Sequence, residues 1–195
     1  KLLDTVKESN FDEAILAKDI MKGYLTGKYQ LKDFRGLIDE GLDDDQMMLG
    51  EQRDGKAKRL YSILERAALA EKRHASLVKR AKVYAGNYEV TVTPDVLFRT
   101  AHSVELVLYR IGKPTVTQNG KKQDASVNNC LELYFLLKYA RRFVPEGKAM
   151  DVKASYYFLR KKTDKATELA NEDFFETKGG NIVTLTEENY IGGTT

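Results

Sequence analysis

The sequence contains a single cysteine, Cys130, among its 195 residues. One thiol cannot form a disulfide within the chain, and clusters held by cysteines need several. No stretch reaches the roughly 20 consecutive apolar residues of a membrane-spanning helix. The first residues also lack the basic and then apolar pattern of a secretory leader. These absences exclude a disulfide framework and an iron–sulfur cluster within this chain, and we expect a cytoplasmic protein with no membrane partner.

The sequence also lacks the motifs of several common enzyme classes. It has no glycine-rich phosphate loop, no dinucleotide-binding glycine fingerprint and no Ser-His-Asp order of a catalytic triad. What it has instead is a balanced composition, with 42% hydrophobic and 31% charged residues, which favours a globular fold over disorder.

The net charge of +3 conceals an uneven distribution. Counted along the sequence, residues 57–113 carry 11 basic and 5 acidic side chains, whereas residues 1–56 carry 9 basic and 13 acidic ones. A basic middle third favours a localised anionic partner. A solvated, basic helix face would give the same count, and both interpretations remain open.

The first part of the chain predicts helices. Apolar residues recur at helical spacing from Ala14 to Leu25, after a predicted N-cap at Asn10 and before a stop at Gly27. We expect further helices over 31–42 and 56–82, with the acids 43–45 capping the later one. The predicted organisation is an N-terminal helical region, 1–56, followed by a core of residues 57–195.

Four arginines recur every seven residues along the predicted helix 56–82. They are Arg59, Arg66, Arg73 and Arg80. On a helix this spacing forms one stripe, which either follows a phosphate backbone or solubilises the surface.

After Gly86 the pattern changes from helical spacing to alternation. Residues 88–98 and 104–110 predict two strands of a hairpin, because β-branched and aromatic residues alternate there or form an apolar run. An almost entirely apolar helix over 127–143 and strands over 150–159 and 181–186 follow. This order predicts an α/β layer with an added helical region.

Short motifs in this part of the chain match a known order. Thr93-Pro94-Asp95 places an acid on the first strand, Leu108-Tyr109-Arg110-Ile111-Gly112 ends the second, and Tyr134 lies on the apolar helix before the strand with Tyr156-Tyr157-Phe158-Leu159. Residues 87–159 thereby resemble the RecB-like branch of the PD-(D/E)XK nuclease superfamily. The resemblance implies a restriction-endonuclease-like fold, a central mixed sheet flanked by helices. It also implies an exonuclease or repair nuclease that hydrolyses phosphodiester bonds in DNA with Mg²⁺ or Mn²⁺.

Two positions depart from the family's Asp-Tyr-Lys motif. Its second acid falls on Leu108 and its lysine on Arg110. Leucine offers no metal ligand, and arginine keeps a positive charge for phosphate but cannot act as a base. The site is therefore expected to be eroded, with Asp95 and Glu105 as the surviving carboxylates and metal ligands, and Arg110 and Lys113 facing phosphate.

Glu105 has two interpretations. In a regular strand it lies on the face opposite Arg110, as an edge or surface acid. A bulge or a slip of one residue would bring it to the metal side. Further candidate ligands are Glu65, Glu71 and His74 on the predicted long helix, although a lone helix histidine is more often structural.

Three functions remain open on these grounds. The first is a metal-dependent DNA exonuclease, and the second is an inactive nuclease-fold module that binds nucleic acid or serves as a scaffold. The third is a helical protein-interaction domain whose acidic first third contacts a protein partner.

Overall fold

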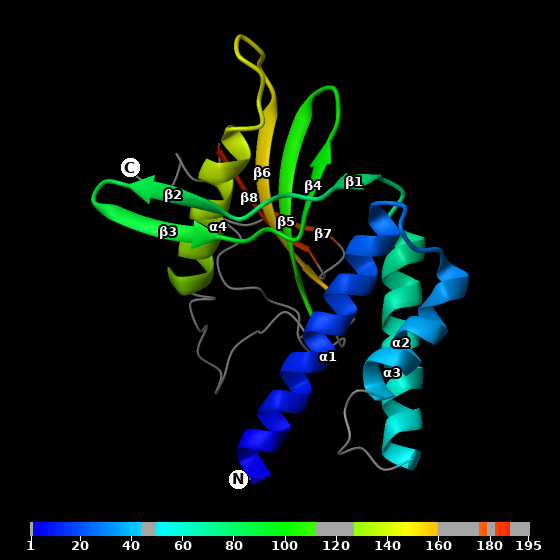
Figure 1. Ribbon diagram of the computed structural model, residues 1–195. Helices are drawn as coiled ribbons and strands as arrows, with labels where there is room; N and C mark the ends of the chain where they lie inside the picture. Colours follow the sequence, from blue (N-terminus) through cyan, green and yellow to red (C-terminus); the bar gives the residue numbers. More distant parts are fainter. Residues whose placement is uncertain (1, 44–49, 112–126, 160–175, 179–181, 188–195) are drawn as a thin grey trace. The chain divides into compact units, whose positions relative to one another are not determined.

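The computed structural model describes residues 2–43, 50–111, 127–159, 176–178 and 182–187 (Figure 1). The chain divides into two compact units, 1–74 and 75–195. The helix that crosses the expected boundary at residue 56 lies wholly in the first unit, because its apolar side packs against the preceding helices.

The first unit is helical. Its elements are α1 (Leu2–Leu25), a short 3₁₀ turn η1 (Leu31–Asp33), α2 (Phe34–Asp43) and α3 (Gly50–Ala70). The apolar positions of the three helices form its core, which includes Met21, Phe34, Ile38, Leu60 and Leu64. Gly27 ends α1 with a φ of 80°, a left-handed conformation that favours glycine.

Three helical predictions need correction. Helix α1 begins at Leu2, so Asn10 lies inside it and is not an N-cap. Asp43 is the last residue of α2 and does not cap the next helix, while residues 44 and 45 lie outside the described residues. The long helix spans 50–70 and not 56–82, because the chain beyond Ala70 pairs into strands.

The described residues of the second unit form a six-stranded mixed sheet. Its strands, in spatial order, are β1 (Ala75–Ser76), β4 (Val96–Arg99), β5 (Ser103–Arg110), β6 (Asp151–Phe158), β8 (Ile182–Thr186) and β7 (Glu176–Lys178). β4 and β5 form the expected antiparallel hairpin, with Val96 opposite Val107. β5 and β6 are parallel and pair without interruption from Ser103–Asp151 to Arg110–Phe158.

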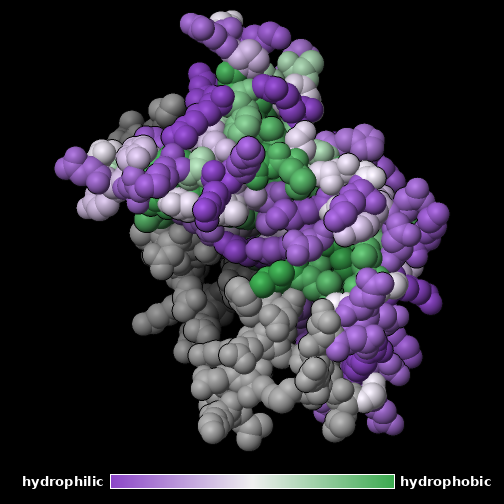
Figure 2. Space-filling view, in the orientation of Figure 1, coloured by the Kyte–Doolittle hydropathy of each residue, from purple (hydrophilic) through white to green (hydrophobic). Residues whose placement is uncertain are grey.

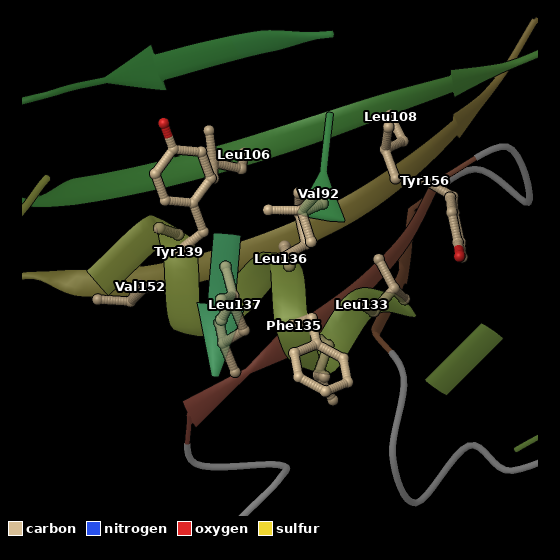
Figure 3. Packing of buried hydrophobic residues seen from close by; sticks show 14 of the residues in the cluster. Val92, Leu106, Leu108, Leu133, Phe135, Leu136, Leu137, Tyr139, Val152 and Tyr156 are labelled. Atoms are coloured by element: carbon tan, nitrogen blue, oxygen red, sulfur yellow. The ribbon is translucent and has the colours of Figure 1, made fainter. Parts of the chain in front are cut away.

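Helix α4 (Val127–Arg141) connects β5 to β6 and covers one face of the sheet. Leu106 and Leu108 of β5 and Tyr156 of β6 point toward it, and Leu133 and Leu136 of the helix pack among them (Figure 3). The predicted helix and the strands 104–110, 150–159 and 181–186 are confirmed to within two residues at each end.

A separate hairpin packs against another side of α4 (Figure 1). It consists of β2 (Ala81–Ala85) and β3 (Tyr88–Val92), joined at Gly86, whose φ is 59°. Val83 and Val92 join the core around α4. This second contact explains why the helix is apolar on nearly every side.

The hairpin corrects two predictions. β2 lies in a segment expected to be helical, and the strand expected over 88–98 is two strands in different sheets. Pro94 lies between them, and proline has no N–H to donate to a strand ladder. The second unit is thus a mixed α/β structure with a mixed sheet and helix.

No helix among the described residues combines the length and the apolar character needed to cross a bilayer.

Candidate functional site

The parallel pair β5–β6 ends where three polar side chains meet. Arg110 is the last residue of β5, Tyr156 lies near the end of β6, and Glu132 comes from α4. Ligands in open α/β sheets commonly bind beside the carboxyl ends of parallel strands. This edge of the sheet is therefore the candidate site.

Glu132 holds the other two side chains through one oxygen. Its Oε2 lies 2.6 Å from a guanidinium nitrogen of Arg110 and accepts a hydrogen bond from the Tyr156 hydroxyl. The Arg110 guanidinium also stacks over the Tyr156 ring, 5.0 Å from its centroid. The Arg110 and Glu132 side chains keep 37% and 42% of their surface exposed, so solvent and ligands reach both.

These contacts change proton affinities. Burial raises the pKa of the Tyr156 hydroxyl above its ordinary value of 10.0, and the hydrogen bond to Glu132 and its negative charge raise it further. Burial lowers the pKa of Arg110, but the charge of Glu132 and the hydrogen bonds of the cluster outweigh burial and leave that pKa raised. Arg110 stays cationic, Tyr156 stays neutral, and neither side chain is prepared to act as a base near neutral pH.

Asp95 lies at the start of β4, beside the end of β5 that carries Arg110. It immediately precedes β4 and is 6% exposed. Its N–H donates to the Val107 carbonyl at 2.9 Å, and its Oδ2 accepts a hydrogen bond from the Tyr109 N–H at 2.7 Å. The carboxylate thus extends the ladder between the two strands.

Leu108, which the sequence resemblance aligned with the second acid of the nuclease motif, is part of the hydrophobic core. It is 6% exposed and lies beside Tyr156 on the face of the sheet that α4 covers (Figure 3). Leucine here gains the free energy of apolar burial. Two residues farther along the same side of β5, Arg110 reaches the helix end that bears Glu132.

Glu105 lies on the face that its first interpretation gave it, but it is not an edge or surface acid. The pairing of β5 with β6 has no bulge or slip, so Glu105 lies on the face opposite Arg110. It is nevertheless 6% exposed, on a central strand, and accepts a hydrogen bond from Ser155 at 2.6 Å. Because Ser155 gives its one hydroxyl proton to Glu105, Thr184, 2.9 Å away, must donate to Ser155. Glu105 is therefore the end of a buried hydrogen-bond chain.

The predicted arginine stripe does not exist as one helix face. Arg59 and Arg66 lie exposed on α3, but Arg73 and Arg80 follow the helix. Arg73 forms a salt bridge with Glu71 at 3.0 Å. Burial opposes ionisation of Glu71, but the hydrogen bonds and charge of Arg73 outweigh it and lower the pKa of this carboxyl.

The other predicted metal ligands do not share one helix as expected. Glu65 lies on α3 and accepts a hydrogen bond from Tyr61 at 3.0 Å, whereas Glu71 and the exposed His74 lie beyond the helix. Lys113 lies outside the described residues. In the part of the chain that the structure describes, no three His, Cys, Asp or Glu side chains are grouped as metal ligands.

Glu132 and Tyr156 are the site residues that sequence reasoning missed. Both belong to segments that were identified, but Glu132 is 22 residues from Arg110 and 24 from Tyr156. The available signal was a lone acid on an otherwise apolar helix, which must find a cation or a donor if it is partly buried.

Comparisons with known proteins give no relative for this chain. No protein-family model, no curated protein and no solved structure matches it.

Proposed function

We propose that this chain binds DNA through a sheet of the restriction-endonuclease-like type and has lost the cleavage chemistry of the PD-(D/E)XK nucleases. The observation that carries the proposal is the pair Leu108 and Arg110. Leu108 contributes to the core where the family has a carboxylate, while Arg110 keeps a cation at the open end of the sheet. Among the described residues Arg110 has no group of three metal ligands beside it, and a cation alone supports binding of phosphate but not hydrolysis.

The arrangement of the second unit agrees with this proposal. An acid, two antiparallel strands, a helix and a parallel strand follow one another in the order of the motifs that carry the resemblance, with Asp95 just before β4 rather than on a strand. Arg110 presents a planar fork of donors, which matches two oxygens of one phosphate. Glu132 would compete with that phosphate for the guanidinium, so the ion pair limits affinity until the ligand displaces it.

An active exonuclease is the second candidate function. Asp95 favours it, because this carboxylate is buried at the position where the family places its first acid. Activity would require Mg²⁺ or Mn²⁺ held by Asp95 together with oxygen ligands that the described residues do not group around it.

Two measurements separate these functions. Binding of linear DNA is measured by fluorescence anisotropy across a series of salt concentrations, and cleavage is measured with Mg²⁺ and with Mn²⁺. Binding that weakens with salt, without cleavage, is the expected result. Asp95→Asn is the matched variant, because asparagine retains an oxygen to accept the Tyr109 hydrogen bond.

Each alternative outcome has a clear meaning. Metal-dependent cleavage that disappears in Asp95→Asn would establish the exonuclease and refute the loss of chemistry. Absence of any DNA binding at low salt would refute both functions and leave a protein partner as the ligand to seek.

A further inference from the structure

A groove opens between α4 and the free edge of β2, away from the cluster around Arg110. It has a volume of about 470 Å³, within the roughly 300–1,000 Å³ typical of ligand sites. Val83 and Leu137 form its apolar floor, and two tyrosines, Tyr84 and Tyr134, line it. The groove thus offers apolar and aromatic surface together.

The rim of the groove is positively charged. Lys138, Arg141 and Arg142, all exposed on or directly after the last turn of α4, line it together with one carboxylate, Glu187. Arg141 lies 3.3 Å from that carboxylate. Among the described residues that line the groove, three cations face one acid, and this excess of positive charge favours an anionic ligand.

Contacts with the hairpin fix the cations beside the tyrosines. Lys138 donates to the Tyr84 carbonyl at 3.3 Å and stacks over the Tyr134 ring, 5.3 Å from its centroid. Arg142 donates to the Lys82 carbonyl at 3.0 Å. The Lys82 and Tyr84 carbonyls belong to the edge of β2 that no strand pairs in the described structure. Lys138 and Arg142 therefore lie side by side along this edge.

The hairpin leaves its aromatic side chains available to solvent. Tyr84 is 54% exposed, and Tyr88, at the end of the hairpin, is 76% exposed. The hairpin surface visible in Figure 2 is otherwise mostly hydrophilic. Large aromatic rings exposed among cations resemble the surfaces on which unpaired bases stack.

We propose that this groove binds a single-stranded nucleic acid, with a base stacked on Tyr84 and the neighbouring phosphates on Arg141 and Arg142. A single strand is favoured over a duplex because its bases have free faces for stacking, whereas duplex bases are already stacked on one another. The inference rests on the proposed function, since it names the form of nucleic acid, and it adds a second binding surface apart from the Arg110 cluster.

The test measures anisotropy of labelled oligo(dT), oligo(U) and a duplex of the same length. The charge variant is Arg141→Gln with Arg142→Gln, in which glutamine still supplies a donor for the Lys82 carbonyl. Its matched control is Lys32→Ala with Lys72→Ala, two exposed cations in the first unit. The stacking pair is Tyr84→Ala and Tyr84→Phe, of which only the second keeps a ring.

We expect wild type to prefer single strands over the duplex. Tyr84→Ala should weaken binding about tenfold, in line with the loss of one stacked base, and Tyr84→Phe should bind nearly as wild type. The double glutamine variant should lower the slope of log affinity against log salt by about 0.7 for each lost phosphate contact. The control pair should leave that slope unchanged.

Two failures are distinguishable. If wild type binds single strands but the groove variants bind equally well with intact circular dichroism, the groove is not the site and the proposed function stands. Equal affinity for the duplex also overturns the inference. Absence of binding to every nucleic acid at low salt refutes the proposed function itself.

Discussion

Replacing Glu132 by glutamine should strengthen DNA binding, because it removes the charge that competes with phosphate for Arg110. Glutamine preserves the shape and an oxygen for the Tyr156 hydroxyl. In the wild type, Glu132 Oε2 lies 2.6 Å from the Arg110 guanidinium, and the two side chains are 37% and 42% exposed. Ion pairs with such solvent access contribute about 0.2–1 kcal/mol to stability. We therefore expect the free energy of unfolding to fall by about 1 kcal/mol or less.

The effect on binding should be larger than the effect on stability. Release of Arg110 adds one phosphate contact, which steepens the slope of log affinity against log salt by about 0.9 for duplex DNA. Glu146→Gln is the matched control, because it removes one charge from an exposed acid beyond α4. The gain should also vanish when Arg110→Ala is added.

The assay combines fluorescence anisotropy across a salt series with a urea melt of each variant. The reasoning is refuted if Glu132→Gln, still folded, binds no more tightly than Glu146→Gln. It is equally refuted if the gain persists without Arg110, since the added affinity would then come from net charge alone.

Three further predictions concern the same unit. Leu137 is 5% exposed beneath the hairpin. Leu137→Ala should lower the free energy of unfolding by about 2–5 kcal/mol, and a decrease below about 0.5 kcal/mol in a urea melt would contradict the buried position. Because the pKa of Tyr156 is raised in the folded state, its contribution to stability is fully present below pH 10.0 and is lost as the pH rises above that value. Tyr156→Phe should therefore flatten the alkaline part of the curve of unfolding free energy against pH. An unchanged curve would exclude Tyr156 as the source of the alkaline loss of stability. Leu108→Asp with Arg110→Lys introduces the Asp-Tyr-Lys motif of the nucleases that the sequence resembles. It should produce Mg²⁺-dependent cleavage of linear DNA above the wild-type level if only those two side chains are missing. Melting of this double variant must be measured alongside, because it introduces a carboxylate into the core, and a folded variant without cleavage would show that more than two groups are absent.

The segments with one dominant pattern were predictable from the sequence. β5 is nearly apolar throughout, as a central strand should be. α4 is mostly apolar over 15 residues, which is too long for a typical strand. β6 follows the same logic. In each case local preference and tertiary burial favour the same structure, so the pattern and the fold agree.

The segment after α3 was not predictable in the same way. Ala75 and Val78 continue a helical spacing, whereas Ala81, Val83 and Ala85 alternate and precede Gly86. Both patterns are present, and pairing with β3 and β4 decides between them. The alternation together with the glycine turn was the signal for a hairpin.

The strand that carries Arg110 was predicted, but the partners of this side chain were not. The ion pair between Arg110 and Glu132 joins residues 22 positions apart on different elements. Glu105 was harder still, because its burial depends on Ser155, which is 50 positions away. Long-range hydrogen bonds of this kind leave no periodic trace in a sequence.

The parallel pairing of β5 and β6 also constrains how the second unit folds. Leu97 pairs with Leu106 across nine positions, whereas Ser103 pairs with Asp151 across 48. Closing the longer loop costs more chain entropy before any contact forms, and distant pairings slow folding. The β4–β5 hairpin should therefore be protected from hydrogen exchange early in refolding, while β6 gains protection only after α4 has docked and brought it alongside β5.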